Sequence, residues 1–165
     1  MTNRLRIILL LCALIPLAAC QRDAEHLSVN GKVFIFNIRL ARAYYVLTLN
    51  RLDGVPDGAV VTAEFENPAG GPPLVSSQKV FPKMTRIDLQ SPSLECVAAG
   101  KPYAIKVTLR APDGTAMQVL ETTLSSTLDQ TVMPEKPLVR GAAYDRNPEA
   151  YGPDGKIRMR QACAP

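Results

Sequence analysis

Apolar and polar residues alternate along much of the chain between residues 31 and 130. The pattern is clearest over 59–66, where Val61, Ala63 and Phe65 fall on one side and mainly polar residues on the other. A period of two indicates a β-strand with one buried and one solvated face. Strands are expected at 31–38, 43–52, 59–66, 74–81, 84–89, 103–109 and 116–125. The pattern therefore predicts an all-β domain.

Three Pro-Asp-Gly triplets interrupt the chain, beginning at Pro56, Pro112 and Pro153. Glycine adopts positive φ readily and proline fixes its own φ, so the triplet is typical of a tight turn. The alternative is a fragment of a calcium-binding loop, but the alternating oxygen ligands and the final glutamate of an EF-hand loop are missing. Turns are therefore expected at these positions, and no metal site is.

The segment around Tyr103 carries a more specific signal. Tyr103 lies three residues after Gly100 and begins a strand in which Ile105, Val107 and Leu109 share its face. This segment resembles the start of strand F in fibronectin type III domains and related sandwiches, where such a tyrosine hydrogen-bonds to upstream backbone. The chain has no Trp, which those domains usually carry in an early strand. The resemblance implies an immunoglobulin-like β-sandwich, an architecture that hosts many unrelated functions.

The first twenty residues have a different character. Arg4 and Arg6 precede an apolar run over 7–17, which ends in Leu17-Ala18-Ala19-Cys20. The run is too short to span a hydrocarbon core and has the layout of an export signal. Its ending resembles the lipobox of bacterial lipoproteins. The resemblance implies that residues 1–19 are a cleaved signal peptide and that Cys20 is lipidated at the mature N-terminus.

The implied lipid on Cys20 would attach the protein to a membrane, because several acyl chains together anchor a protein stably. In Gram-negative lipoproteins an Asp after the modified cysteine favours the inner membrane. Gln21 in that position indicates the periplasmic face of the outer membrane, with the inner membrane as the alternative. Residues 20–30 are then expected to be a tether, residues 31–130 the sandwich and residues 131–165 an extended tail.

The remaining cysteines suit the same oxidising compartment. Cys12 leaves with the signal and Cys20 takes the lipid, so Cys96 and Cys163 are left as a pair. A Cys96–Cys163 disulfide is the natural assignment and would hold the tail to the domain. The alternatives are two free thiols, or a redox or metal pair. The chain has no CxxC motif, and its one histidine, His26, lies in the expected tether.

The tail from residue 131 onwards is rich in proline, glycine and charge, so an extended coil laid over the sandwich is expected, with a short strand at 156–160. Tyrosine and arginine contribute most to binding energy in protein interfaces. The tail is therefore a candidate partner-binding segment. The alternative is that its tyrosines cover the open end of the sandwich. The candidate residues are Tyr144, Arg146, Tyr151, Arg158 and Arg160.

Several function classes find little support in the residues. Two of the 19 basic residues belong to the signal, so the mature chain has only a small excess over 15 acidic residues. The longest basic cluster is 156–160, which falls short of a nucleic-acid-binding surface. A Ser-His-acid hydrolase needs a histidine placed by the fold, and His26 is too close to the expected anchor for that role. No catalytic residues, metal or cofactor are predicted.

Three functions of different classes remain. The first is a non-enzymatic adaptor, or an assembly or stability factor, for another envelope protein; a secretion-system pilotin is its most specific form. The second is a module that binds a small ligand or a glycan, which would show a closed concave pocket. The third is a hydrolase with a pair of carboxylates whose spacing the sequence does not reveal.

Overall fold

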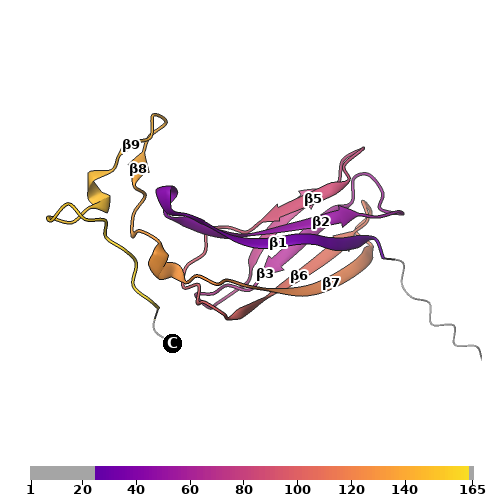
Figure 1. The fold of residues 1–165 in the computed structure, drawn as a ribbon. Coiled ribbons are helices and arrows are strands. Elements are labelled where there is room, and N and C mark those ends of the chain that lie inside the picture. The colour runs from indigo at the N-terminus through magenta and orange to yellow at the C-terminus, as the bar shows by residue number, and fades with distance from the viewer. Residues whose placement is uncertain (1–24, 164–165) are drawn as a thin grey trace, which may run out of the picture.

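A computed structural model describes residues 25–163. Cys20 and the expected signal peptide lie outside these residues. The described chain is an all-β immunoglobulin-like sandwich with a tail fixed by a disulfide, as the sequence predicts (Figure 1). The strands are β1 Leu27–Asn37, β2 Arg42–Arg51, β3 Val60–Phe65, β4 Leu74–Lys79, β5 Arg86–Gln90, β6 Pro102–Arg110, β7 Ala116–Ser125, β8 Val139–Arg140 and β9 Asp145–Arg146. Three 3-10 turns are η1 Ile38–Leu40, η2 Gln130–Val132 and η3 Pro148–Ala150.

The sandwich consists of two antiparallel sheets. One has three strands in the order β1-β2-β5, and the other has four in the order β4-β3-β6-β7. In an immunoglobulin constant-type domain the fourth strand belongs to the sheet of the first two strands, whereas here β4 pairs with β3. Strands β1 and β7 are therefore the edges that meet along one open side of the sandwich (Figure 1).

The core is built by the alternation that the sequence shows. In β3, Val61, Ala63 and Phe65 are fully buried, while the residues between them face outwards or are half-buried. The ring of Phe65 stacks on Tyr45 of β2, with 5.2 Å between the ring centroids and 10° between the ring planes. Tyr103 of β6 contacts the same Tyr45 edge-on. A small aromatic group therefore joins the two sheets.

The tyrosine corner expected at Tyr103 is confirmed. The Tyr103 hydroxyl oxygen accepts a hydrogen bond from the backbone N–H of Ala98, five residues upstream, at 2.9 Å. The Tyr45 hydroxyl donates to the carbonyl of Glu66 at 3.1 Å. Burial raises the pKa of Tyr45 well above its ordinary value, and the nearby Tyr103 and Glu66 raise it further. The two hydroxyl groups therefore fix backbone at one end of the sandwich.

Strand β1 begins earlier than the sequence predicts. The segment 20–30 was expected to be a tether, but β1 starts at Leu27, whose side chain is almost completely buried. The cause is Gln118 of β7, which binds the backbone of Leu27 and of His26. Residues 27–30 of the expected tether therefore belong to β1, which has a bulge between Val29 and Gly31.

The tail also differs from the expectation. It lies beyond one end of the sandwich, next to η1, rather than along a sheet face (Figure 1). It contains the short β8–β9 hairpin and η3, where an extended coil was expected. The strand expected at 156–160 is reduced to two isolated bridges, Tyr151 with Ile157 and Pro134 with Met159.

Candidate functional site

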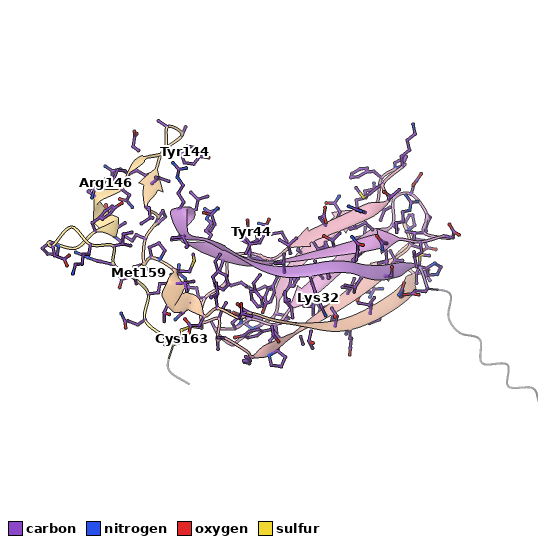
Figure 2. All side chains as sticks on the ribbon, viewed as in Figure 1. Lys32, Tyr44, Tyr144, Arg146, Met159 and Cys163 are labelled. Atoms are coloured by element: carbon purple, nitrogen blue, oxygen red, sulfur yellow. A yellow bond between two sulfur atoms is a disulfide. The ribbon has the colours of Figure 1, made fainter. Side chains whose placement is uncertain are left out.

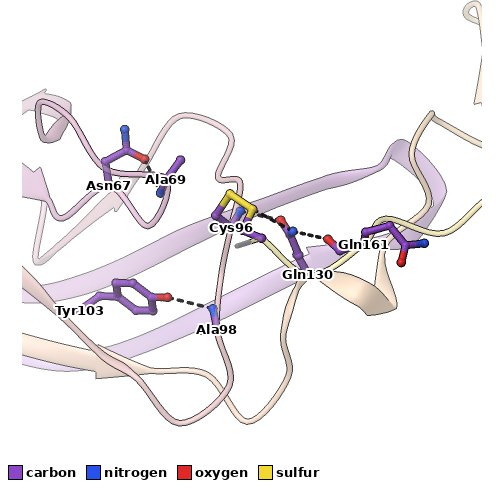
Figure 3. Close-up of a disulfide and its surroundings, with 8 residues drawn as sticks. Asn67, Ala69, Cys96, Ala98, Tyr103, Gln130 and Gln161 are labelled. Carbon is purple, nitrogen blue, oxygen red and sulfur yellow. Dashed lines mark hydrogen bonds between the residues drawn. A yellow bond between two sulfur atoms is a disulfide. The ribbon is translucent and has the colours of Figure 1, made fainter. Parts of the chain in front are cut away.

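The disulfide fixes the far end of the tail to the sandwich. Cys96 and Cys163 are bonded, with 5.4 Å between their Cα atoms, which confirms the predicted pair (Figure 3). Gln130 lies beside them and is 7% exposed. Its Oε1 accepts from the Cys96 N–H at 2.6 Å, and its Nε2 donates to the carbonyl of Gln161 and lies 3.1 Å from the Cys163 sulfur. This amide therefore holds both ends of the bridge in position.

A second attachment holds the tail to η1. The backbone N–H of Leu138 donates to the Arg39 carbonyl at 2.9 Å. The Arg160 guanidinium donates to the carbonyl of Ala41 at 3.1 Å and to that of Pro134 at 3.3 Å. Met133 is fully buried in this region, outside the main core of the sandwich. The described part of the tail, residues 131–163, is therefore an ordered lobe with a small buried centre.

Tyr144 is the most prominent residue of the lobe. It ends the turn between β8 and β9 with φ 58°, a left-handed conformation, and it is 55% exposed. The guanidinium of Arg39, from η1, lies 5.0 Å from the centre of its ring. An exposed cation–π contact of this kind contributes about 0.5–1 kcal/mol. Arg39 therefore orients an aromatic ring that stays open to solvent.

Arg146 and Tyr151 form a second pair. The Arg146 guanidinium lies 4.1 Å from the centre of the Tyr151 ring, which is half-buried. Tyr151 follows η3, and its backbone pairs with Ile157 across the last turn of the lobe. The fold thus brings two of the five candidate residues into contact, and Tyr151 is half-buried where the sequence indicated an exposed residue.

The last two candidates differ from each other. Arg158 is exposed, and its hydrogen bonds within the described chain are made by its backbone, to Ala150 and Glu135. Arg160 is half-buried and directs its guanidinium to the carbonyls of Ala41 and Pro134. Its exposure is therefore smaller than expected, because the tail uses this side chain to hold itself against η1.

Arg39 is a residue of this surface that the sequence did not predict. The residue lies between two predicted strands, and its partner Tyr144 is more than one hundred residues away. Its only local signal is its place in Ile38-Arg39-Leu40, where Asn37 caps the 3-10 turn and Ala41 takes φ 51°. The capping pattern indicates a turn but does not reveal the aromatic partner.

The lobe carries more basic than acidic residues. Two of its carboxylates are already paired: Glu149 with Lys136 at 2.7 Å, and Asp154 with Lys156 at 3.9 Å. The hydrogen bond from Lys136, followed by its charge, lowers the pKa of Glu149 below the ordinary value. The exposed basic residues in and beside the lobe are Arg39, Arg42, Lys136, Arg140, Arg146, Lys156 and Arg158. The surface is therefore suited to a partner with acidic groups.

A pocket of about 520 Å³ lies next to the disulfide. Its volume is that of a small-molecule site, but its polar groups already bind within the protein. The Tyr103 hydroxyl binds the Ala98 N–H, and the Gln130 amide binds the backbone of Cys96 and Gln161. Lys101 pairs with Glu66 at 3.4 Å. Few polar groups therefore converge on the space.

The described residues hold no group of three or more His, Cys, Asp or Glu side chains arranged for a metal. The Nδ1 atom of His26 lies 3.2 Å from the carbonyl oxygen of Asp53, at the end of the sandwich opposite the lobe. The described helices are single 3-10 turns, none of which has the length or apolar composition to span a membrane.

The sequence matches no protein-family model and no curated protein significantly. Function is therefore inferred from the fold and from the surface described above.

Proposed function

We propose that the protein is a lipid-anchored envelope lipoprotein that acts as a non-enzymatic adaptor, or an assembly or stability factor, for another envelope protein. The observation that supports this proposal best is the tail lobe. The lobe is held at one end by the Cys96–Cys163 bridge and at the other by η1, and it presents Tyr144 and Arg158 to solvent.

Order in the lobe favours binding. A partner that docks on a fixed surface does not have to pay the entropy of ordering it. Tyr144 is held by Arg39, and the lobe backbone is closed by hydrogen bonds such as those from Glu135 to Arg158 and from Arg160 to Met133. Tyrosine and arginine are enriched at the energetic centres of interfaces, and the basic surroundings favour an acidic segment on the partner.

The position of the lobe also suits this role. Strand β1 begins at the end of the sandwich opposite the lobe (Figure 1). A lipid on Cys20, a few residues earlier in the chain, would approach from that end. The lobe would then be free of the anchor. Because Gln21 rather than Asp follows Cys20, we also propose the periplasmic face of the outer membrane as its location, with a pilotin-like role as the most specific form of the proposal.

The experiment is partner capture in intact cells. The full-length chain is cross-linked in the envelope, purified, and its cross-linked partners identified by mass spectrometry. Tyr144→Ala/Arg158→Ala is compared with Phe81→Ala/Arg86→Ala. The second pair removes a half-exposed aromatic and an exposed arginine from the other end of the sandwich.

The lobe variant is expected to lose at least tenfold of the partner yield, with a melting temperature close to that of the unchanged protein. The control variant should retain the yield. Equal capture by both variants would rule out the lobe as the binding surface. A native N-terminus without lipid, or one that is not Cys20, would rule out the anchor independently.

A further inference from the structure

Strand β1 leaves backbone groups unpaired along the open side of the sandwich. The carbonyls of Tyr45 and Ala43 in β2 point to the β5 side of the sheet. They accept hydrogen bonds from the N–H groups of Ser91 and Leu94, which follow β5. The partners of Tyr45 and Ala43 in β1 are Phe34 and Phe36, so the polar backbone groups of these two phenylalanines point away from β2. By the same alternation, the backbone N–H and C=O of Lys32, which lies opposite Leu47, also point away from β2. No hydrogen bond to these groups is found within residues 25–163.

The start of β1 is protected and its end is not. Gln118 of β7 binds the backbone of Leu27, and Lys32 donates from its side chain to the Thr122 hydroxyl at 2.7 Å. A bulge between Val29 and Gly31 bends the strand between these contacts. A bulge hinders an edge strand from pairing, and so does a lysine with a free side chain, whereas the Lys32 side chain turns to Thr122 and its backbone groups stay open. From residue 33 to η1 the edge has neither.

Both faces of this unprotected segment are apolar. On the outer face, Val33 lies opposite Val46 and Ile35 opposite Tyr44, and Val33 is 48% exposed. On the inner face, the Phe34 ring contacts Tyr45, with 4.6 Å between the centroids, and Phe36. Figure 2 shows Tyr44 on the outer side of the sheet and Lys32 on the side of β7. A strand added here would need aliphatic residues on one face and aromatic residues on the other.

We propose that a second copy of this chain adds its own β1 to this edge, in antiparallel register with a two-fold axis through Phe34. In this register Phe34 faces the partner's Phe34, and Lys32 faces the partner's Phe36. All three open residues then exchange about six backbone hydrogen bonds across the axis. Val33 faces the partner's Ile35, so the apolar outer faces of the two sheets become continuous.

Complementarity favours a second copy over another strand. The edge favours aliphatic residues on one face and aromatic residues on the other, and Val33-Phe34-Ile35-Phe36 of a second β1 supplies both. Lys32 is the only charged residue between 31 and 37, and the register places it opposite the partner's Phe36, so no two like charges face each other across the axis. An isologous two-fold contact is also the commonest form of homo-oligomer. In this register the start of the partner's β1 lies beside η1, so each lobe lies next to the partner's N-terminal end, and the dimer is tested by measurements separate from partner capture.

The register can be tested by cysteine pairing in the full-length chain. Opposed residues at a pair without backbone hydrogen bonds have Cα atoms about 4.5 Å apart, within the range of a disulfide. Val33→Cys and Ile35→Cys produced together in one cell should therefore form a cross-linked dimer under mild oxidation. Either variant alone should not cross-link, because residue 33 faces residue 35 and not itself.

A second measurement asks whether this edge holds the dimer. Sedimentation of the purified full-length chain should give twice the monomer mass, and Val33→Lys should raise the dissociation constant at least tenfold. Val119→Lys is the matched control, since Val119 is 54% exposed on β7 of the other sheet, and it should leave the dimer unchanged. A monomeric chain would overturn the proposal. So would a dimer that persists in Val33→Lys, or one that fails to cross-link at residues 33 and 35.

Discussion

Gln118 binds both backbone polar groups of Leu27. Its Oε1 accepts from the Leu27 N–H at 2.7 Å, and its Nε2 donates to the Leu27 carbonyl at 3.0 Å. The same Oε1 accepts from the His26 N–H at 2.9 Å. Since Gln118 lies in β7 and Leu27 begins β1, one side chain of the four-stranded sheet satisfies the edge of the three-stranded sheet. This contact closes one end of the open side of the sandwich.

Replacing this amide should loosen the start of β1. Gln118→Ala removes three part-buried hydrogen bonds and is expected to lower the free energy of unfolding by about 1–3 kcal/mol. The Leu27 amide should also exchange with solvent much faster. Urea denaturation and hydrogen exchange measure the two effects. Gln90→Ala, an exposed glutamine on β5, is the control, and unchanged protection of Leu27 in Gln118→Ala would contradict the assignment.

The disulfide should stabilise the lobe more than the sandwich. Cys96 and Cys163 are separated by 67 positions, so the polymer model gives up to about 4 kcal/mol of lost unfolded-chain entropy. Met133 lies outside the main core, so Cys96→Ser/Cys163→Ser should release the lobe while the sandwich stays folded. Limited proteolysis should then cut first between residues 133 and 163. Equal protection of the lobe in both proteins would contradict this expectation.

The Lys136–Glu149 pair should make the lobe slightly sensitive to acid. Lys136 lowers the pKa of Glu149, so the ionised pair stabilises the folded state above the unfolded-state pKa, and this contribution is lost as pH falls through the folded-state pKa. Glu149→Gln should therefore lower the melting temperature slightly at neutral pH and not at strongly acidic pH. The effect is small because both side chains are exposed.

Thermal melts across pH test this expectation, and Glu121→Gln, an exposed carboxylate on β7, is the control. An NMR titration that gives Glu149 an ordinary or raised pKa would contradict it.

Much of the sandwich follows from local pattern. Val61, Ala63 and Phe65 alternate with outward residues, and this order depends only on the period of a strand. Tyr103 could be placed because its corner bond reaches only five residues back, to Ala98. The Cys96–Cys163 pair followed once Cys12 and Cys20 were assigned to the expected signal peptide and lipidation site, because no other cysteine is left in the sequence. Features that depend on nearby residues or on residue count were therefore predictable.

Features that depend on distant partners were not predictable. Leu27 reads as part of a polar tether because the residue that binds its backbone, Gln118, is 91 positions away. The contact of Arg39 with Tyr144 depends on where the lobe folds back on η1. Arg158 and Arg160 are two positions apart and have similar neighbours in the sequence. Only the Arg160 side chain, however, donates to the carbonyl of Ala41, next to η1. Their different roles arise from tertiary packing.

This difference gives the sharpest test of the lobe. Arg160→Ala removes two charge-assisted hydrogen bonds, to the carbonyls of Ala41 and Pro134. The carbonyls of these two buried residues then lose this donor. The substitution should lower the free energy of unfolding by about 1–3 kcal/mol, or release the lobe to proteolysis at native conditions. Arg158→Ala removes only an exposed side chain and should change stability by less than about 0.5 kcal/mol. Denaturation curves and proteolysis rates for the two variants give the comparison directly.

If both lose stability equally, the contacts of Arg160 do not hold the lobe. If only Arg160→Ala loses stability while only Arg158→Ala loses partner capture, the first arginine supports the surface that the second presents.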